Sequence, residues 1–158
     1  MPPILSEITT CLTATSDTPA LDASVLLAHI LNKPRTWIMA HPELTLSSEQ
    51  QNQLNESLAR LENGEPFPYV IGTWEFFGLE FDITCDVLIP RPETELLVEK
   101  AIVWIQNHPD KHTIADVGTG SGAIAISLAL HLPQANILAT DIFQKRSTLP
   151  DKMQKNIV

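Results

Sequence analysis

The sequence predicts a mixed α/β protein, with a small helical bundle first and the beginning of a parallel, doubly wound sheet last. Apolar residues recur at helical spacing through the first 64 residues. A segment that alternates apolar and polar residues between glycines follows. Further on, a strand, a glycine-rich turn, a helix and a second strand succeed one another, as in a βαβ unit. We therefore expect a helical domain at 1–64, a β-hairpin linker at 65–90 and a partial Rossmann-like domain at 91–158.

The composition is that of a folded, acidic protein. The chain has 158 residues, 44% of them hydrophobic and 18% charged, with a formal net charge of −9. This charge argues against direct nucleic-acid binding, which depends on Lys and Arg. Because we find no signal-peptide pattern and no apolar run near the roughly 18 residues of a membrane span, we expect a cytoplasmic protein that binds no membrane. Cys11 and Cys85 belong to no metal-binding or disulfide pattern, so we expect buried apolar fillers and no metal site.

Short helices account for the first domain. The spacing predicts helices over residues 4–12 and 35–40, and between them a longer helix with Pro19 in its first turn. Ser47 and Gln50 form a capping box that opens a fourth helix. In the longer helix we expect one buried face, made of Leu21, Val25, Ala28 and Leu31.

A hairpin and a further helix come next. Residues 79–83 alternate in polarity as a half-buried strand does, and residues 73–77 supply its partner across a turn at Gly78. The next helix begins after Pro92, with Glu93 in its first turn. Its apolar face is wide, so we expect a largely buried helix. Two neighbouring stripes make up that face: Leu97, Ala101 and Trp104, then Val98, Ile102 and Ile105.

The glycine-rich turn at 116–122 indicates a nucleoside-binding site. It follows a predicted strand and opens a helix, whose N-terminus offers unpaired N–H groups and a partial positive charge. Asp141 stands at the end of the next strand, 19 residues after Gly122, where a carboxylate can accept hydrogen bonds from both hydroxyls of a ribose. The predicted cofactor-binding residues are Asp116, Gly118, Thr119, Gly120, Gly122 and Asp141.

The residues around this turn favour S-adenosylmethionine as the ligand. The turn reads G-T-G-S-G, not G-x-G-x-x-G, and the chain has no G-x-x-x-x-G-K-[ST] loop for triphosphates. Asp116, just before the first glycine, suits an ammonium or sulfonium cation better than a pyrophosphate. A dinucleotide is the weaker alternative.

Two longer stretches resemble the release-factor glutamine methyltransferases, S-adenosylmethionine enzymes that methylate the side-chain amide of a glutamine. They are Pro66-x-Pro68-Tyr69-x-x-Gly72 with Glu75-Phe76, and the stretch from Leu88 to Glu99 that contains Ile-Pro-Arg-Pro-Glu-Thr-Glu. Asp116 through Ala125 also matches, although generic methyltransferases share that pattern. The resemblance runs from near the start of the chain to about Ile142.

This resemblance implies a helical substrate-recognition domain before a catalytic domain that binds S-adenosylmethionine. It implies that Gly118, Gly120 and Asp141 hold the cofactor, and that Arg91, Pro92, Glu93 and Thr94 lie near its pocket. The implied partner is a peptide-chain release factor, whose Gly-Gly-Gln loop is methylated, or a ribosomal protein with a similar glutamine. We expect a monomer.

The end of the chain departs from the family. No catalytic residue can be assigned, because the Asn-Pro-Pro-Tyr motif with which the family holds the amide is absent from the sequence. Pro150 stands where the family has the interior of a helix, in a segment, 143–158, with four Lys or Arg against one Asp. A coding sequence can be chosen for residues 145–158 that, when translated in the frame two bases further on, gives Ala-Leu-Asp-Ile-Ala-Arg-Gln-Asn-Ala. This is the helix pattern of the family. We therefore expect a frameshift that truncates and inactivates this chain; a divergent natural tail is the alternative.

Two other functions remain open. One is a different S-adenosylmethionine methyltransferase, acting on a ribosomal protein, DNA or a small molecule. The other is a non-catalytic fragment that binds a release factor through its helical domain.

Overall fold

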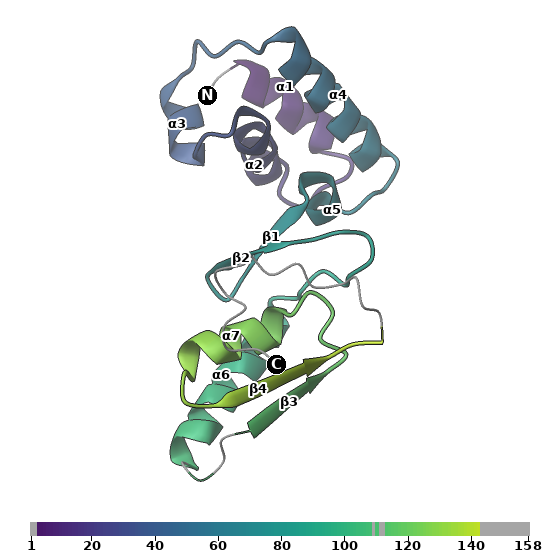
Figure 1. Cartoon of the computed structure of the whole chain (residues 1–158). Coiled ribbons are helices and arrows are strands. Elements are labelled where there is room, and N and C mark those ends of the chain that lie inside the picture. Colours follow the sequence, from purple (N-terminus) through teal and green to yellow (C-terminus); the bar gives the residue numbers. More distant parts are fainter. Residues whose placement is uncertain (1–2, 109, 111–112, 143–158) are drawn as a thin grey trace. The chain divides into compact units, whose positions relative to one another are not determined.

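The computed structural model describes residues 3–108, 110 and 113–142. It divides the chain into two compact units, residues 1–71 and 72–158. The first unit is helical, and the second combines two small sheets with helices (Figure 1). The expected α/β class, with helices first and strands later, is confirmed.

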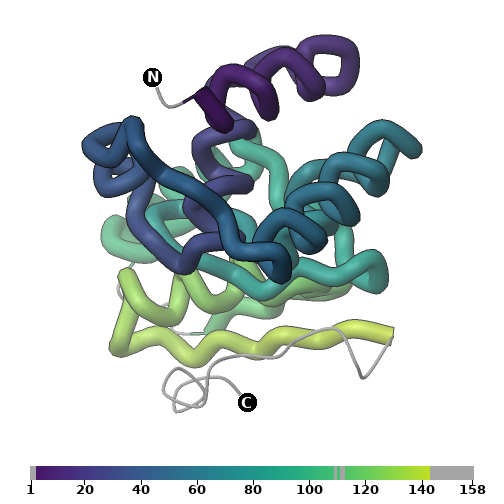
Figure 2. Tube along the Cα trace, turned by 90° about the horizontal axis from the view of Figure 1, so that it is seen from above, coloured from purple at the N-terminus to yellow at the C-terminus, as the bar shows by residue number. Residues whose placement is uncertain are grey.

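The first unit is a bundle in which α1, α2 and α4 pack on one another (Figures 1 and 2). The predicted helices are present within a few residues of the expected bounds. Its helices are α1 (Pro3–Leu12), α2 (Pro19–Leu31), α3 (Arg35–Ala40), α4 (Ser48–Glu62) and α5 (Phe67–Ile71). The capping box of α4 is confirmed: the Gln50 N–H donates to Ser47 Oγ at 3.2 Å, and the Ser47 N–H donates to Gln50 Oε1 at 2.9 Å.

The core of this unit is apolar and comes from all five helices. It contains Leu5, Ile8, Leu12, Ala23, Leu26, Leu27, Ile38, Leu54, Leu61 and Val70. The face that we predicted for α2 is right only in part: Ala28 and Leu31 are half-buried against the core, but Leu21 is 43% exposed. The fully buried leucines are Leu26 and Leu27. Both faces of α2 are apolar, so helical spacing alone could not choose between them.

The helix α5 was not predicted, because Pro66 and Pro68 suggested a linker. Proline is tolerated in the first turn of a helix, where its missing N–H has no intrahelical partner. The N–H of Tyr69 donates to the carbonyl of Pro66 at 2.9 Å and closes that turn. The expected linker, 65–90, is thus divided between the two units, with α5 in the first and the hairpin in the second.

The second unit begins with the predicted hairpin. Strands β1 (Thr73–Phe76) and β2 (Leu79–Asp82) pair antiparallel, with Phe76 opposite Leu79. Phe77 and Gly78 both have positive φ, +53° and +73°, as in the two-residue turns that suit a hairpin. The N–H of Phe77 donates to Glu95 Oε1 at 2.9 Å, which ties the hairpin to the next helix.

A βαβ unit follows, as expected. After α6 (Glu93–Asn107), the strands β3 (Thr113–Val117) and β4 (Asn136–Thr140) run parallel, with α7 (Ala123–His131) between them in sequence. Ile114 lies opposite Ile137. The helix α7 packs against both α6 and β4.

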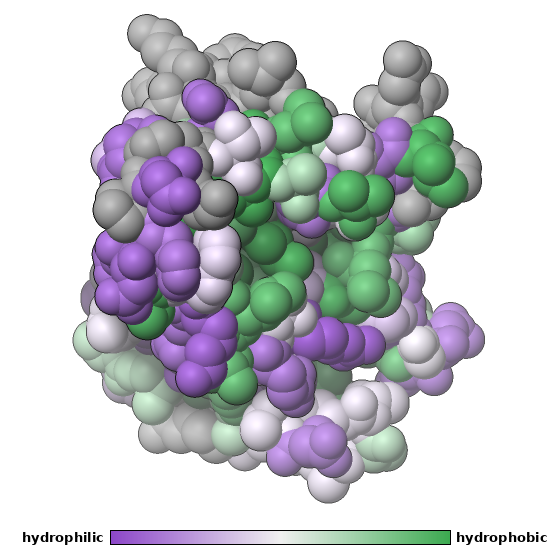
Figure 3. Space-filling model, turned by 90° about the horizontal axis from the view of Figure 1, so that it is seen from below, coloured by the Kyte–Doolittle hydropathy of each residue, from purple (hydrophilic) through white to green (hydrophobic). Residues whose placement is uncertain are grey.

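The expectation that α6 is largely buried is wrong. Val98 and Ile105 are buried, but Leu97 and Trp104 are 56% and 50% exposed. Apolar residues are also exposed on the strands, with Val117 at 82% and Leu138 at 43%. In Figure 3, hydrophobic side chains gather on the surface of the second unit between hydrophilic ones.

The structure also bears on the expectations for the cysteines, for a membrane span and for the end of the chain. Cys11 and Cys85 are exposed, so they are not the buried fillers that we expected. Among the helices of the described residues, none is both long and apolar enough to span a membrane. The expected change of frame after Ile142 concerns residues 143–158, which lie outside the described part of the chain.

Candidate functional site at the glycine-rich turn

The glycine-rich turn connects β3 to α7 and is bonded to the end of β4. The N–H groups of Gly118 and Thr119 both donate to the carbonyl oxygen of Thr140, at 2.7 and 3.0 Å. Thr140 is the last residue of β4, and Asp141 follows it directly. The parallel pairing of the two strands therefore brings the turn and Asp141 to one end of the sheet.

The three positions at which this turn requires glycine differ in what surrounds them. Gly118 and Gly120 have φ of +79° and +56°, and a Cβ on either would meet no atom within 4 Å. The space beside them is open, so a ligand can approach the backbone closely. Gly122 has φ of +78° and is buried, and a Cβ there would lie 3.1 Å from Ile126 Cδ1. It serves close packing at the start of α7.

The two aspartates of the predicted site both hold the turn. Asp116 Oδ2 accepts a hydrogen bond from Thr119 Oγ1 at 2.7 Å. Asp141 Oδ2 accepts one from the N–H of Gly120 at 2.9 Å. Both aspartates are half-buried. Their carboxylates therefore occupy fixed positions at the turn, which is the preorganisation that a binding site needs.

A cavity of about 220 Å³ lies beside the turn. The turn, the start of α7, the stretch 88–94 and β1 contribute its walls. Of the predicted residues, Gly118, Thr119, Gly120, Arg91 and Thr94 line it. The predicted residues Asp116, Gly122, Asp141, Pro92 and Glu93 do not line the cavity.

The sequence reasoning missed the apolar wall of this cavity. Phe76, from β1, is 1% exposed and lines it, as do Leu88 and Ile89. Phe76 belongs to a stretch that resembles the release-factor glutamine methyltransferases, and the resemblance assigns it no role at the cofactor. A mostly apolar wall with a few polar groups is typical of sites for small molecules. Among the described residues, His, Cys, Asp and Glu form no group of three that could hold a metal ion.

Comparison with known proteins shows where this chain has relatives. Residues 4–72 match the family described as PrmC N-terminal domain. A protein named Release factor glutamine methyltransferase from Coxiella burnetii is 49% identical over 133 residues, or 82% of this chain and 47% of that protein. The protein of the same name from Escherichia coli is 42% identical over 126 residues, or 80% of this chain and 45% of that protein.

A third relative extends the match further along the chain. The protein of the same name from Buchnera aphidicola is 38% identical over 141 residues, or 89% of this chain and 50% of that protein. The chain therefore spans about half the length of the curated relatives it matches.

Proposed function

Because the chain belongs to the family of release factor glutamine methyltransferases, we propose that it carries the N-terminal half of such an enzyme. The proposed reaction is the methylation, by S-adenosylmethionine, of the glutamine amide in the Gly-Gly-Gln loop of a peptide-chain release factor. The observation that carries the proposal is the cavity, in which the generic glycine turn and the family-specific stretch 88–94 meet. The second unit is then the start of a Rossmann-like domain.

The residues present fit this cofactor. The open space at Gly118 and Gly120 lets a ligand approach the backbone, and the cavity has an apolar wall for an adenine ring. Asp141 and Asp116 hold the turn from outside the cavity, so they would meet the part of the cofactor that extends beyond it. Asp141 would accept hydrogen bonds from the ribose hydroxyls, and Asp116 would favour the cationic end of the molecule. When bound, the cofactor supplies a methyl group on a sulfonium, which is activated for transfer to a nucleophile.

Arg91 would bind the carboxylate of the cofactor. It lines the cavity together with Thr94, and a guanidinium is the side chain best suited to a carboxylate. The cofactor would thus meet an acidic group for its ammonium or sulfonium and a basic group for its carboxylate. Pro92 and Glu93, which open α6, would position these two lining residues from outside the cavity.

The chemistry also needs a group that holds the substrate amide. An amide nitrogen is a poor nucleophile, because its lone pair is delocalised into the carbonyl, so it must be oriented by hydrogen bonds in line with the methyl group. The 158 residues contain no Asn-Pro-Pro-Tyr to do this. We therefore propose that the 158-residue chain, tested by itself, transfers no methyl group, and that a frame change near Lys145 separates it from that motif.

A methyl-transfer assay tests this function. The gene is sequenced past the codon for Val158, and a chain extended in the restored frame is compared with the 158-residue chain. Radiolabelled S-adenosylmethionine is the donor, and a purified release factor is the acceptor. We expect transfer by the extended chain only, and none to a release factor whose Gly-Gly-Gln is changed to Gly-Gly-Ala. Equal transfer by both chains would contradict the role given to Asn-Pro-Pro-Tyr.

The same assay separates the alternative substrates. Ribosomal proteins, DNA and a small-molecule extract replace the release factor in parallel reactions, and labelling of one of them instead would contradict the proposed substrate. A non-catalytic role is the second candidate, because the matched N-terminal domain, residues 4–72, has a hydrophobic core of its own. Co-precipitation with release factor in the absence of cofactor tests that role.

A further inference from the structure

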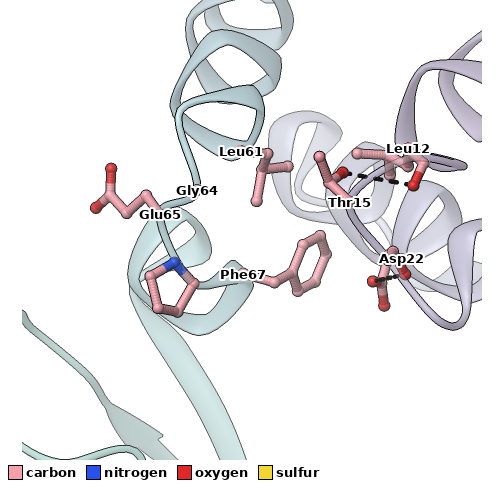
Figure 4. Close-up of a pocket in the computed structure, with 9 residues that line it drawn as sticks. Leu12, Thr15, Asp22, Leu61, Gly64, Glu65 and Phe67 are labelled. Carbon is pink, nitrogen blue, oxygen red and sulfur yellow. Dashed lines mark hydrogen bonds between the residues drawn. The ribbon is translucent and has the colours of Figure 1, made fainter.

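A second cavity, of about 250 Å³, lies within the first unit and is separate from the proposed cofactor site. The α1–α2 turn and the first turn of α2 form one side, and the end of α4 with the start of α5 forms the other. In Figure 4 the side chains of Leu61 and Phe67 point across the gap toward Thr15 and Asp22, whereas Glu65 points away. A cavity of this volume has room for a single long side chain.

Asp22 gives this cavity its charge. Its Oδ2 accepts a hydrogen bond from Ser16 Oγ at 2.6 Å, and its Oδ1 accepts one from Thr18 Oγ1 at 3.3 Å. The carboxylate is half-buried and fixed by these two hydroxyls. Within residues 3–108, 110 and 113–142, the one ion pair joins Arg60 to Glu65, so Asp22 has no cationic partner there.

The rest of the cavity complements a cation on an aliphatic stem. Leu12 and Leu61 line the cavity and are buried, and the ring of Phe67 forms a wall. Lys and Arg bury their methylene groups against such apolar surfaces and place their charged ends near a carboxylate or an aromatic face. Residues 1–71 also contain eight Asp or Glu against three Lys or Arg, which attracts a basic partner.

We propose that this cavity binds a Lys or Arg side chain of the protein substrate, with Asp22 as the ionic partner. That the substrate is a release factor rests on the function proposed above, whereas the cavity and its preference for a cation do not. The first unit then recognises its partner through a basic side chain, which is a different residue from the glutamine that is methylated.

Nuclear magnetic resonance on the whole chain tests the cation preference directly. Blocked arginine, N-acetyl-arginine amide, is titrated into the ¹⁵N-labelled protein, with N-acetyl-norleucine amide as the uncharged control. We expect saturable shifts at the amides of Thr15, Asp22 and Gly64 with the arginine compound only. Absence of these shifts, or equal shifts with the norleucine compound, would overturn the proposal.

The same site is then tested on the protein partner. Purified release factor is titrated with wild type, with Asp22→Asn and with the control Asp17→Asn, an exposed acid of the same turn that does not line the cavity. Asparagine keeps the oxygen that Ser16 bonds but removes the charge. We expect Asp22→Asn to weaken binding about fivefold and Asp17→Asn less than about twofold. Circular dichroism verifies that each variant is folded, and Phe67→Leu replaces Asp22→Asn if that variant is not.

The outcomes separate the two proposals. Equal binding by wild type and Asp22→Asn would overturn the role of the cavity and leave the proposed function intact. If wild type does not bind release factor but blocked arginine shifts the cavity amides, the preference for a cation stands and the proposed partner is wrong.

Discussion

The carboxylate of Asp141 accepts a hydrogen bond from the backbone N–H of Gly120, with 2.9 Å between Oδ2 and the nitrogen. The two residues are 21 positions apart and meet because β3 and β4 pair in parallel, so that their carboxyl ends lie at one edge of the sheet. The acid proposed to bind the ribose therefore also holds the turn in place. Its removal should disturb the turn before any ligand is considered.

The first prediction concerns this bond. Asp141→Ala removes the acceptor of the Gly120 N–H, and a hydrogen bond to a charged group typically contributes about 1.5 kcal/mol or more. We expect the Gly120 amide to exchange with solvent about tenfold faster in this variant. In Asp141→Asn the side-chain oxygen still accepts, so the rate should stay within about threefold of wild type. Hydrogen exchange followed by nuclear magnetic resonance measures both, and an unchanged rate in Asp141→Ala would show that the bond contributes nothing.

The second prediction concerns the capping box of α4. Ser47→Ala removes the oxygen that accepts from the Gln50 N–H and should lower the free energy of unfolding of the first unit by about 1 kcal/mol. Urea titration followed at the amide signals of α4 measures it. Ser48→Ala is the matched control, because Ser48 is the first helical residue and not the cap. Equal losses in the two variants would mean that the cap is not the cause.

The elements that could be predicted from the sequence are those in which a local pattern has one solution. The capping box at Ser47 fixes where α4 begins, and alternating polarity with Gly78 fixes the hairpin. Buried faces could not be predicted for α2 and α6, because each helix carries two apolar stripes. Their neighbours select Leu26 rather than Leu21, and Val98 rather than Leu97. That selection depends on packing between segments distant in sequence.

The residues of the candidate site also fall into those that could be predicted from a local pattern and those that could not. The turn residues and Asp141 follow from the order of strand, turn, helix, strand and acid, which is a local pattern. The opposite wall of the cavity could not be predicted, since Phe76 comes from the hairpin and reaches the turn only through the packing of the second unit. Arg91 and Thr94 were found through a family resemblance, not through spacing.

The third prediction concerns Arg60, which joins α4 to α5. Its guanidinium donates to Glu65 at 2.6 and 2.8 Å and to the carbonyl of Tyr69 at 3.0 Å. Arg60→Met keeps much of the apolar stem and removes these bonds. Because the side chain is 39% exposed, we expect a loss of only about 1 kcal/mol, seen in urea titration at the amide signals of α4 and α5. A change confined to the second unit would contradict this assignment.

The fourth prediction is a pH dependence from the same pair. The hydrogen bond from Arg60, together with its positive charge, holds the pKa of Glu65 below its ordinary value. Because its pKa is lower in the folded state, Glu65 contributes to the free energy of unfolding. This contribution is fully present above the unfolded-state pKa and is lost as the pH falls through the folded-state pKa. The urea concentration at the unfolding midpoint of the first unit should therefore decrease as the pH is lowered below about 4.5, the ordinary pKa of a glutamate.

Glu65→Gln is the control for that titration. It removes the titrating group, so the acid-induced fall should be smaller than in wild type, while the remaining carboxylates titrate in both proteins. Parallel pH profiles for the two proteins would show that Glu65 does not contribute to the acid limb.

The last prediction tests which side of α6 is packed. Val98 is fully buried, whereas its neighbour Leu97 is 56% exposed. Val98→Ala removes two methyl groups and leaves a cavity, which should cost about 2 kcal/mol. Leu97→Ala removes a larger group from a site that is half in water, and it should cost less than about 0.5 kcal/mol. Urea titration followed at the amide signals of β3 and β4 measures both variants in the second unit. The smaller deletion, Val98→Ala, should thus cause the larger loss of stability. The reverse order would mean that the stripe that contains Leu97 and Trp104 is covered in solution.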